Sequence, residues 1–178
     1  MTSVQTGLLT VDEFLKLPDP KEGHNELHHG EVVVVPPPKR GHQRIQDRIQ
    51  MLLKRQVGDT GSARMEMAFR PAPEYEVWQA DVGYVSSERE ESTGEDEYLM
   101  GAPEVVAEVL SPSNTMDEIL DRQDICLANG CHSFWTVDPK RQVVMVTTPD
   151  RRTHTFDRSS SVPLPAPLQG SVPVAEIF

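Results

Sequence analysis

The stretch VVAEVLSPSN, residues 105–114, reads as a buried strand that stops abruptly. Apolar residues surround Glu108 on both sides, and the Ser-Pro-Ser-Asn segment that follows breaks the strand. A buried carboxylate is costly unless a proton, a cation or a metal ion relieves it. The position of Glu108 therefore raises the question of what meets its side chain in the folded protein.

A second acid has the same setting. Asp81 lies in QADVGYV, residues 79–85, again among apolar residues, and it precedes Glu108 by 27 residues. On neighbouring strands, two such acids form a hard-oxygen site suited to Mg²⁺ or Mn²⁺. The alternative is that either acid points away from a strand that is buried on one face only, or caps a turn. Spacing alone leaves both interpretations open.

The surrounding pattern predicts the architecture. It indicates a short helix, a hairpin, a long helix, two strands, an acidic surface loop, the strand of Glu108, a helix and three further strands. These segments are residues 10–18, 25–35, 42–58, 63–71, 77–85, 87–98, 102–110, 115–129, 132–138, 142–148 and 152–157. Thr10 with Glu13 matches a capping box, and Asn114 or Thr115 is expected to cap the later helix. This order predicts a mixed α/β fold in which helices flank one curved central β-sheet.

The length and charge of the chain limit what it can be. Its 178 residues suit a single domain, 1–178, with a helical lead-in over 1–24 and a Pro-rich tail over 158–178. The tail is expected to wrap the surface before its last residues dock. A formal net charge of −11 argues against a protein that coats nucleic acid non-specifically, because phosphate binding depends on Lys and Arg. It does not exclude a basic or metal-loaded cleft on an acidic body.

The cysteines and the N-terminus indicate the compartment. Cys126 and Cys131 lack a CxxC motif or a His/Cys cluster, so we interpret both as reduced thiols of a cytoplasmic protein, with a disulfide as the alternative. The first residues lack the basic region and apolar run of a signal peptide, and no apolar stretch approaches the length of a membrane span. We expect no membrane contact and no organic cofactor.

Arg122 is a candidate partner of the two acids. It shares one face of its predicted helix with Ile119 and Cys126, and that face is expected to contact the sheet. A guanidinium there can meet both carboxylates. The alternative is an ordinary i, i+4 pair with Glu118 on the helix surface.

Glu31 and His42 are weaker candidates. Glu31 follows the glycine of the hairpin, where it either joins the acidic site or faces solvent. His42 opens the long helix, where it either contacts a phosphate in the same cleft or stays near solvent. Ser111 and Ser113 invite a serine-hydrolase interpretation, but the chain lacks GxSxG, and ending the strand explains them better.

Taken in order, these motifs resemble the bacterial Uma-type family, a domain of unknown function assigned as restriction endonucleases. The matching segments are GEVVVVPPPKRGHQRI, QADVGYV, APEVVAEVLSPSNT and DRQDICLANGCHSFWTVDPKRQVV, within residues 26–146, and a weaker match follows at the C-terminal VAEIF. The combination of EVLSPS, a helix and G-C-x-x-F-W-x-V-D-P is specific, whereas any one piece alone is weak.

The resemblance implies a restriction-endonuclease-like fold, as in the PD-(D/E)xK nucleases, with an acidic metal site at the middle of the sheet. In such enzymes an Asp and a Glu on neighbouring strands hold Mg²⁺, and a Lys two residues after the Glu positions or activates the attacking water. Carried across, Asp81 and Glu108 are the metal ligands. This chain departs from the pattern at Ala80, in place of a proline, and at Leu110, in place of the lysine. In the family this lysine has moved to the following helix, where Arg122 stands here.

The leading hypothesis is a Mg²⁺- or Mn²⁺-dependent endonuclease acting on DNA. Asp81 and Glu108 hold the metal, Arg122 stabilises the transition state, and His42 contacts the substrate. Because Arg stays protonated and cannot act as a base, that role falls to a metal-bound hydroxide or a nearby carboxylate such as Glu31.

The alternative comes from another class: a catalytically degenerate nuclease fold that serves as a binding or assembly module. The net charge, the missing lysine and the absence of a recognition motif favour it. A homodimer is compatible with this architecture, because pairing extends the reach of a small cleft nuclease along a duplex.

Overall fold

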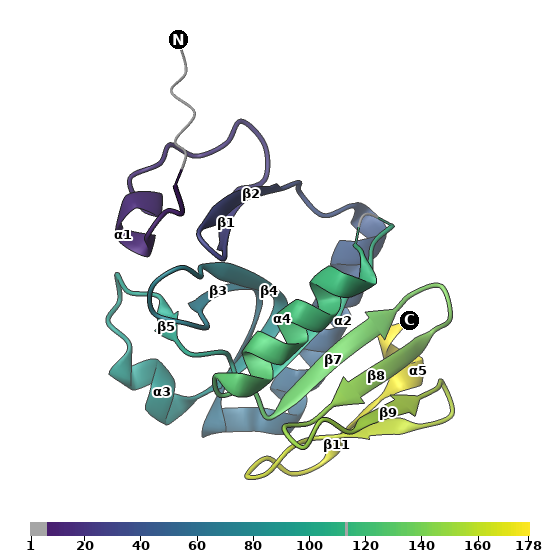
Figure 1. Cartoon of the computed structure of the whole chain (residues 1–178). Helices are drawn as coiled ribbons and strands as arrows, with labels where there is room; N and C mark the ends of the chain where they lie inside the picture. Colours follow the sequence, from purple (N-terminus) through teal and green to yellow (C-terminus); the bar gives the residue numbers. More distant parts are fainter. Residues whose placement is uncertain (1–6, 113) are drawn as a thin grey trace.

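The computed structural model describes residues 7–112 and 114–178, and its centre is a seven-stranded mixed β-sheet (Figure 1). The strand order is β5-β3-β4-β6-β7-β8-β9, with parallel pairing at β3–β5 and β6–β7 and antiparallel pairing elsewhere. The strands are β3 (Gly61–Arg70), β4 (Trp78–Ser86), β5 (Leu99–Met100), β6 (Val105–Val109), β7 (Ser133–Asp138), β8 (Val143–Thr147) and β9 (Thr153–Phe156). The predicted mixed α/β class and central sheet are confirmed.

Helices and two hairpins surround this sheet. They are α1 (Val11–Phe14), α2 (Arg40–Val57), the 3₁₀ turn Gly58–Thr60, α3 (Ser87–Ser92), α4 (Met116–Ala128) and α5 (Val174–Ile177), with hairpins β1 (His24–His28)/β2 (Glu31–Val35) and β10 (Ser161–Pro163)/β11 (Ser171–Pro173). α1 starts with the predicted capping box, and α4 starts with a second one formed by Thr115 and Glu118. Thr115, rather than Asn114, therefore caps α4.

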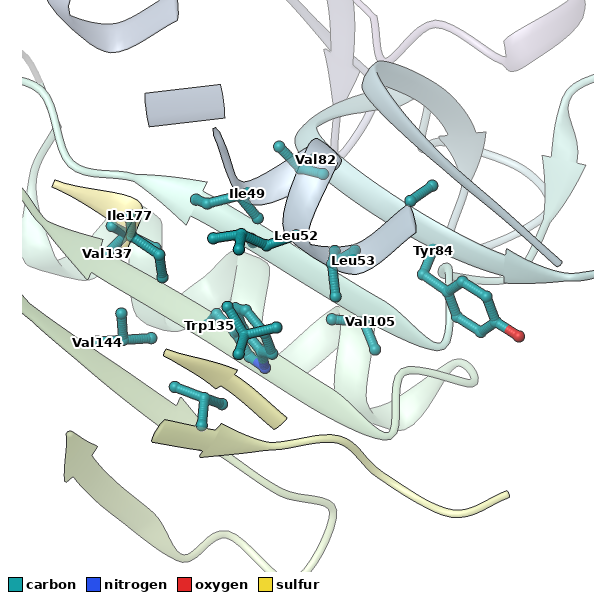
Figure 2. Packing of buried hydrophobic residues seen from close by; sticks show 14 of the residues in the cluster. Ile49, Leu52, Leu53, Val82, Tyr84, Val105, Trp135, Val137, Val144 and Ile177 are labelled. Carbon is teal, nitrogen blue, oxygen red and sulfur yellow. The ribbon is translucent and has the colours of Figure 1, made fainter. Parts of the chain in front are cut away.

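Both faces of the central strands are buried, so β6 and β7 read as continuous apolar runs. On one face, Ile49 and Leu53 of α2 pack against Val105 and Trp135, together with Ile177 of α5 (Figure 2). The opposite face carries α4. This two-sided covering buries the middle of the sheet, where Glu108 lies, whereas the side chain of Asp81 keeps partial contact with solvent.

The face under α4 contains both cysteines. Cys126 and Cys131 are buried free thiols that pack with Val106 and Phe134, in agreement with the expected reduced state. Burial raises the pKa of Cys131 to about 12. In the described part of the chain, no helix has the length and apolar character needed to cross a membrane.

The C-terminal tail is more than a surface wrap. The Pro-rich segment forms the β10–β11 hairpin and α5, and Val162, Val172, Val174 and Ile177 are fully buried in the core beneath α2. Short Ser-Val-Pro strands turn the valine inward and the flanking residues outward. The tail therefore completes the hydrophobic core rather than covering it.

The acidic segment after β4 is also more ordered than expected. Residues 87–98 were predicted as a surface loop, but Ser87–Ser92 forms α3. Arg89 explains this result, because its guanidinium donates to the carbonyl oxygens of Met100 and Ala102 and pairs with Glu104. A tertiary anchor of this kind outweighs the weak local preference that a sequence pattern reports.

The β3–β4 ladder is interrupted beside Asp81. Its register is the same on either side, but Glu66 has a φ of +50° and the pair between Glu66 and Asp81 is missing. Met65 packs in the core under α2, whereas Met67 packs in the core under α4. Irregularities of this kind redirect side chains and occur often beside active sites. Asp81 thus lies at the point where the side chains of β3 switch from one face of the sheet to the other.

The β1–β2 hairpin lies against the edge of this region. A bridge pairs Leu27 of β1 with Val77, just before β4, and Leu27 packs in a small core with Val11 and Phe14 of α1. The outer strand β2 is exposed along most of its length. The hairpin therefore brings the polar side chains of β1 next to the start of β4.

Candidate active site

The two acids predicted from the sequence lie side by side. β4 and β6 are antiparallel, and Val82 is paired with Ala107. The pairing ends there, one residue before the two acids, and Asp81 contacts α2 whereas Glu108 contacts α4. The two carboxylates are nevertheless close enough for Asp81 to help raise the pKa of Glu108. A hydrogen bond of 2.7 Å from the Val109 N–H to Oδ2 of Asp81 ties the two strands together here.

Two side chains of α2 hold the other oxygen of Asp81. Nε2 of His42 and Nε2 of Gln46 each donate to Oδ1 at 2.9 Å. The predicted site residue His42 is thus brought to the acid pair, while its role toward a substrate stays a prediction. Gln46 was not foreseen, although its position one turn after His42, in phase with Ile49, placed it on the buried face.

Glu108 is buried, with 7 % of the residue exposed. Its Oε1 accepts a hydrogen bond of 2.9 Å from Nη1 of Arg122. Burial raises the pKa of Glu108 to about 8, and the nearby carboxylates of Asp81 and Glu26 add to that rise, against the opposing effect of Arg122. The carboxyl group is therefore poised to carry a proton when no further cation is near.

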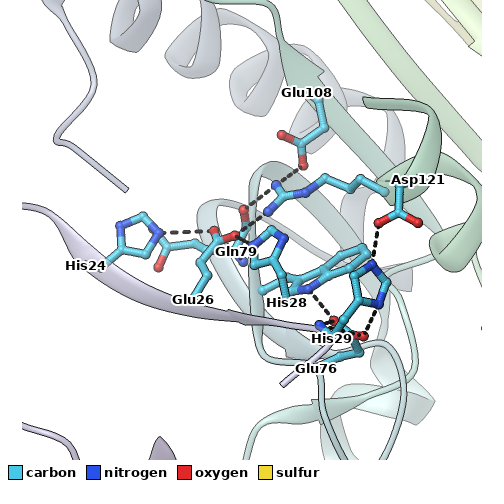
Figure 3. A network of polar contacts seen from close by, with 10 residues as sticks. His24, Glu26, His28, His29, Glu76, Gln79, Glu108 and Asp121 are labelled. Carbon is cyan, nitrogen blue, oxygen red and sulfur yellow. Dashed lines mark hydrogen bonds and ion pairs between the residues drawn. The ribbon is translucent and has the colours of Figure 1, made fainter. Parts of the chain in front are cut away.

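Arg122 of α4 forms ion pairs with two acids, Glu26 and Glu108, which Figure 3 labels. Nη1 donates to Glu108 and, at 3.2 Å, to the carbonyl oxygen of Gln79, while Nη2 forms an ion pair with Glu26. Its guanidinium carbon lies 5.2 Å from the centre of the Trp78 ring, a cation–π contact. The i, i+4 alternative with Glu118 is wrong, because Glu118 instead completes the cap of α4.

Glu26 is a second residue of the site that sequence reasoning missed. It is only 2 % exposed and accepts hydrogen bonds from His24 at 3.2 Å, from His28 at 2.6 Å and from the Gln79 N–H at 3.0 Å, in addition to its pair with Arg122. Burial alone raises the pKa of Glu26, but Arg122 and the two histidines outweigh it and hold the pKa well below the usual range. One signal was available: histidines two residues away on either side share its face of the strand.

A second contact set fixes the hairpin to α4. The ring of His29 pairs with Glu76 at 3.0 Å and with Asp121 of α4 at 2.8 Å, and Glu76 also accepts from Trp78 Nε1 at 2.9 Å. The hydrogen bond that the His29 ring donates to Asp121 raises the pKa of His29, burial opposes this rise, and Glu76 adds to it. His29 thus links the hairpin both to Glu76, just before β4, and to Asp121 of α4 (Figure 3).

Glu31 and the serines lie apart from this centre. Glu31 is exposed at the start of β2, and among the described residues no hydrogen bond or ion pair links it to Asp81, Glu108 or Arg122. Its role in catalysis stays a prediction. The N–H and Oγ of Ser111 donate to Asn114 Oδ1, which suits the expected strand-ending turn, and Ser113 lies outside the described residues.

The site contains more carboxylate groups than guanidinium groups, so a bound cation would balance its charge. Glu26, Asp81 and Glu108 are carboxylates, and Arg122 is the permanently charged group that meets two of them. Within residues 7–112 and 114–178, no group of three or more His, Cys, Asp or Glu side chains has metal-binding geometry. Mg²⁺, however, is usually held by one or two carboxylates together with waters and substrate phosphates. Asp81 and Glu108 fit that donor set.

Comparison with known proteins shows which family this chain belongs to. The model of the Uma2 family, described as "Putative restriction endonuclease", matches residues 11–175. The chain belongs to the Uma2 family. This match confirms the family resemblance seen in the sequence, and the description of the Uma2 family supports a nuclease function. No curated protein matches it.

A solved structure carries the same fold. The crystal structure of "a putative nuclease belonging to DUF820" from Anabaena variabilis is 26% identical in sequence, with a TM-score of 0.79, and the match covers 96% of this Uma2 chain and 97% of that one. The two folds agree over nearly their whole length. The restriction-endonuclease-like fold expected from the sequence is confirmed.

Proposed function

We propose that this protein is a Mg²⁺- or Mn²⁺-dependent endonuclease that hydrolyses phosphodiester bonds in DNA, with Asp81 and Glu108 as the metal ligands. The observation that carries the proposal is the closeness of these two acids on adjacent central strands, where the N–H of Val109, the residue after Glu108, donates to Asp81 at 2.7 Å. Membership in a nuclease family supports a nucleic acid substrate. The surplus of carboxylates over guanidinium at the same point supports the metal.

The residues around the acids suit this chemistry. A bound divalent ion lowers the pKa of a coordinated water and polarises the scissile phosphate. Three donors fix the orientation of the Asp81 carboxylate, as outer hydrogen bonds do for metal ligands in general. Arg122 supplies a permanent positive charge 2.9 Å from Glu108, where it neutralises negative charge that develops on the phosphate. Its high basicity excludes it as the proton acceptor.

Metal binding is the first test. Isothermal titration of Mn²⁺ into the purified protein is expected to show binding that Asp81→Asn abolishes at millimolar metal. Asp117→Asn, which removes an exposed acid of α4, is the matched control and is expected to bind as the wild type does. Equal titration curves for the wild type and Asp81→Asn contradict the assignment of Asp81 as a ligand.

A second candidate is a nuclease fold that serves as a binding or assembly module. The observation that favours it is that Arg122 already satisfies both Glu26 and Glu108 within the protein. An absence of Mn²⁺ binding by the wild type supports this candidate over the enzyme. The homodimer and the cytoplasmic setting expected from the sequence stay predictions under either function.

The Glu26 cluster predicts a pH dependence of stability. Because the folded protein holds the pKa of Glu26 below its ordinary value of 4.5, the stabilisation is fully present above about pH 4.5 and is lost as the pH falls further. Glu26→Gln is expected to lower the free energy of unfolding at pH 7 by on the order of 2 kcal/mol, with a smaller difference at pH 3. Urea unfolding at both pH values measures this, and a difference that stays constant with pH contradicts it.

A further inference from the structure

The arginines of this protein divide into two groups. Among the described residues, every arginine outside α2 forms a hydrogen bond or an ion pair, as expected where 28 acidic residues surround 17 basic ones. On α2, Arg55 pairs with Glu176. Arg40, Arg44 and Arg48 are different, since none of their side chains forms a hydrogen bond or ion pair with a described residue.

These three side chains form a row. They lie at i, i+4 and i+8 of α2, so they share one face of the helix. Arg40 and Arg44 are exposed and Arg48 is half-buried, whereas Ile45, Ile49 and Leu53 occupy the side of the helix buried against the sheet. The row extends about 12 Å along the helix axis. A part of the outer surface there is hollowed, and Arg40, Gly41, Gln43, Arg44 and Asp47 line the hollow.

The local charge is opposite to that of the whole molecule. Between Lys39 and Arg55 the chain carries six basic residues and one acid, Asp47, whereas its formal net charge is −11. A row of guanidinium groups without partners in the protein attracts an external polyanion. Arginine in particular forms paired hydrogen bonds to phosphate through its planar fork.

The row begins at the N-terminal end of α2, which also carries the two side chains that contact Asp81. His42 and Gln46, which bind Asp81, alternate with Arg40 and Arg44 along the first two turns of the helix. The outer row and Asp81 are separated by roughly one helix diameter, about 10 Å. Three nucleotides of a strand span a similar distance at ~3.4 Å each, so one strand can contact the row and still reach the acids.

We propose that Arg40, Arg44 and Arg48 form the surface that binds the phosphate backbone of the nucleic acid substrate. This inference rests on the proposed function for the identity of the ligand, but it concerns binding rather than cleavage. Backbone contacts of this kind fix the position and register of a nucleic acid without reading its sequence. They explain how a chain without a recognition motif retains its substrate.

The test is DNA binding without cleavage. Fluorescence anisotropy of a labelled DNA duplex, with Ca²⁺ in place of Mg²⁺, is measured over a range of salt concentrations for the wild type and for Arg40→Gln/Arg44→Gln/Arg48→Gln. The triple variant is expected to bind at least tenfold more weakly at low salt, and the slope of log affinity against log salt is expected to fall by about 2 to 3. Because Arg40 and Arg44 are exposed, the variant Arg40→Gln/Arg44→Gln, which leaves the half-buried Arg48 in place, should unfold at the wild-type temperature and still bind more weakly.

A matched control removes the same charge elsewhere. Arg141→Gln/Arg152→Gln/Arg158→Gln changes three exposed arginines outside α2 and is expected to bind within about twofold of the wild type. Equal losses in both triple variants, unchanged binding by the α2 variant, or no binding of the duplex by the wild type overturns the proposal. If α2-dependent binding occurs but Mg²⁺ produces no cleavage, the proposed function fails and this inference stands.

Discussion

Replacement of Glu108 by glutamine is expected to leave the fold intact and to lower metal-dependent DNA cleavage by on the order of 10³-fold. The fold should survive because burial raises the pKa of Glu108 to about 8. The folded protein thus tolerates a neutral group at this position near pH 7. Glutamine also keeps an oxygen that accepts the hydrogen bond from Arg122. The loss of activity should follow because glutamine lacks the negative charge of the carboxylate ligands through which proteins usually hold Mg²⁺.

Plasmid cleavage in the presence of Mg²⁺ or Mn²⁺, together with thermal unfolding of the same preparations, checks this prediction. Glu91→Gln, which changes an exposed acid of α3, is the control and should cleave as the wild type does. Full cleavage by Glu108→Gln removes Glu108 from the proposed mechanism. Unfolding of the variant shows instead that the carboxylate is structural, and the less disruptive Asp81→Asn titration then decides the metal site.

Replacement of Arg122 by methionine is expected to cost about 3 kcal/mol of folding free energy. Removal of one partner of a buried ion pair leaves the other charge without compensation, and here the affected groups are Glu26 and Glu108. The raised pKa of Glu108 means that this group can take up a proton at small cost. The penalty therefore falls mainly on Glu26, whose ionised form the protein favours.

Urea unfolding of a double-mutant cycle measures this coupling. If the penalty arises from the unpaired carboxylate, Arg122→Met combined with Glu26→Gln should be less destabilising than the sum of the two single changes. Arg151→Met removes an exposed pair with Asp124 and should cost less than about 1 kcal/mol. Strict additivity of Arg122→Met and Glu26→Gln contradicts the assigned coupling. Activity of folded Arg122→Lys then reports whether any cation suffices or the planar guanidinium is needed.

These two variants separate the proposed functions. Both the enzyme and the module need Arg122 for stability, because it neutralises buried acids in either case. The enzyme alone needs Glu108 as a carboxylate. A stable Glu108→Gln protein with altered metal binding therefore argues for catalysis, whereas a protein indifferent to Glu108→Gln in every assay argues for the module.

Local patterns in the sequence predicted much of the fold because they act over short distances. The capping box of α1, the apolar face of α2 and the two-sided burial around Glu108 each depend on residues within a few positions of one another. The predictions failed where a distant contact decided the outcome. Arg89 converts an acidic stretch into α3, and the valines of the C-terminal tail become core only against α2.

The candidate site divides in the same way. By itself the sequence determined that Asp81 and Glu108 lie in apolar strands, because charged residues inside apolar runs are visible in the chain. Only the tertiary structure decided what surrounds them. Glu26 meets Arg122 across 96 residues of sequence and Gln46 meets Asp81 across 35. The packing of β1, α2 and α4 on the sheet brings such partners together. The charge of a buried group must be balanced by a residue that is close in space, however distant that residue is in the chain.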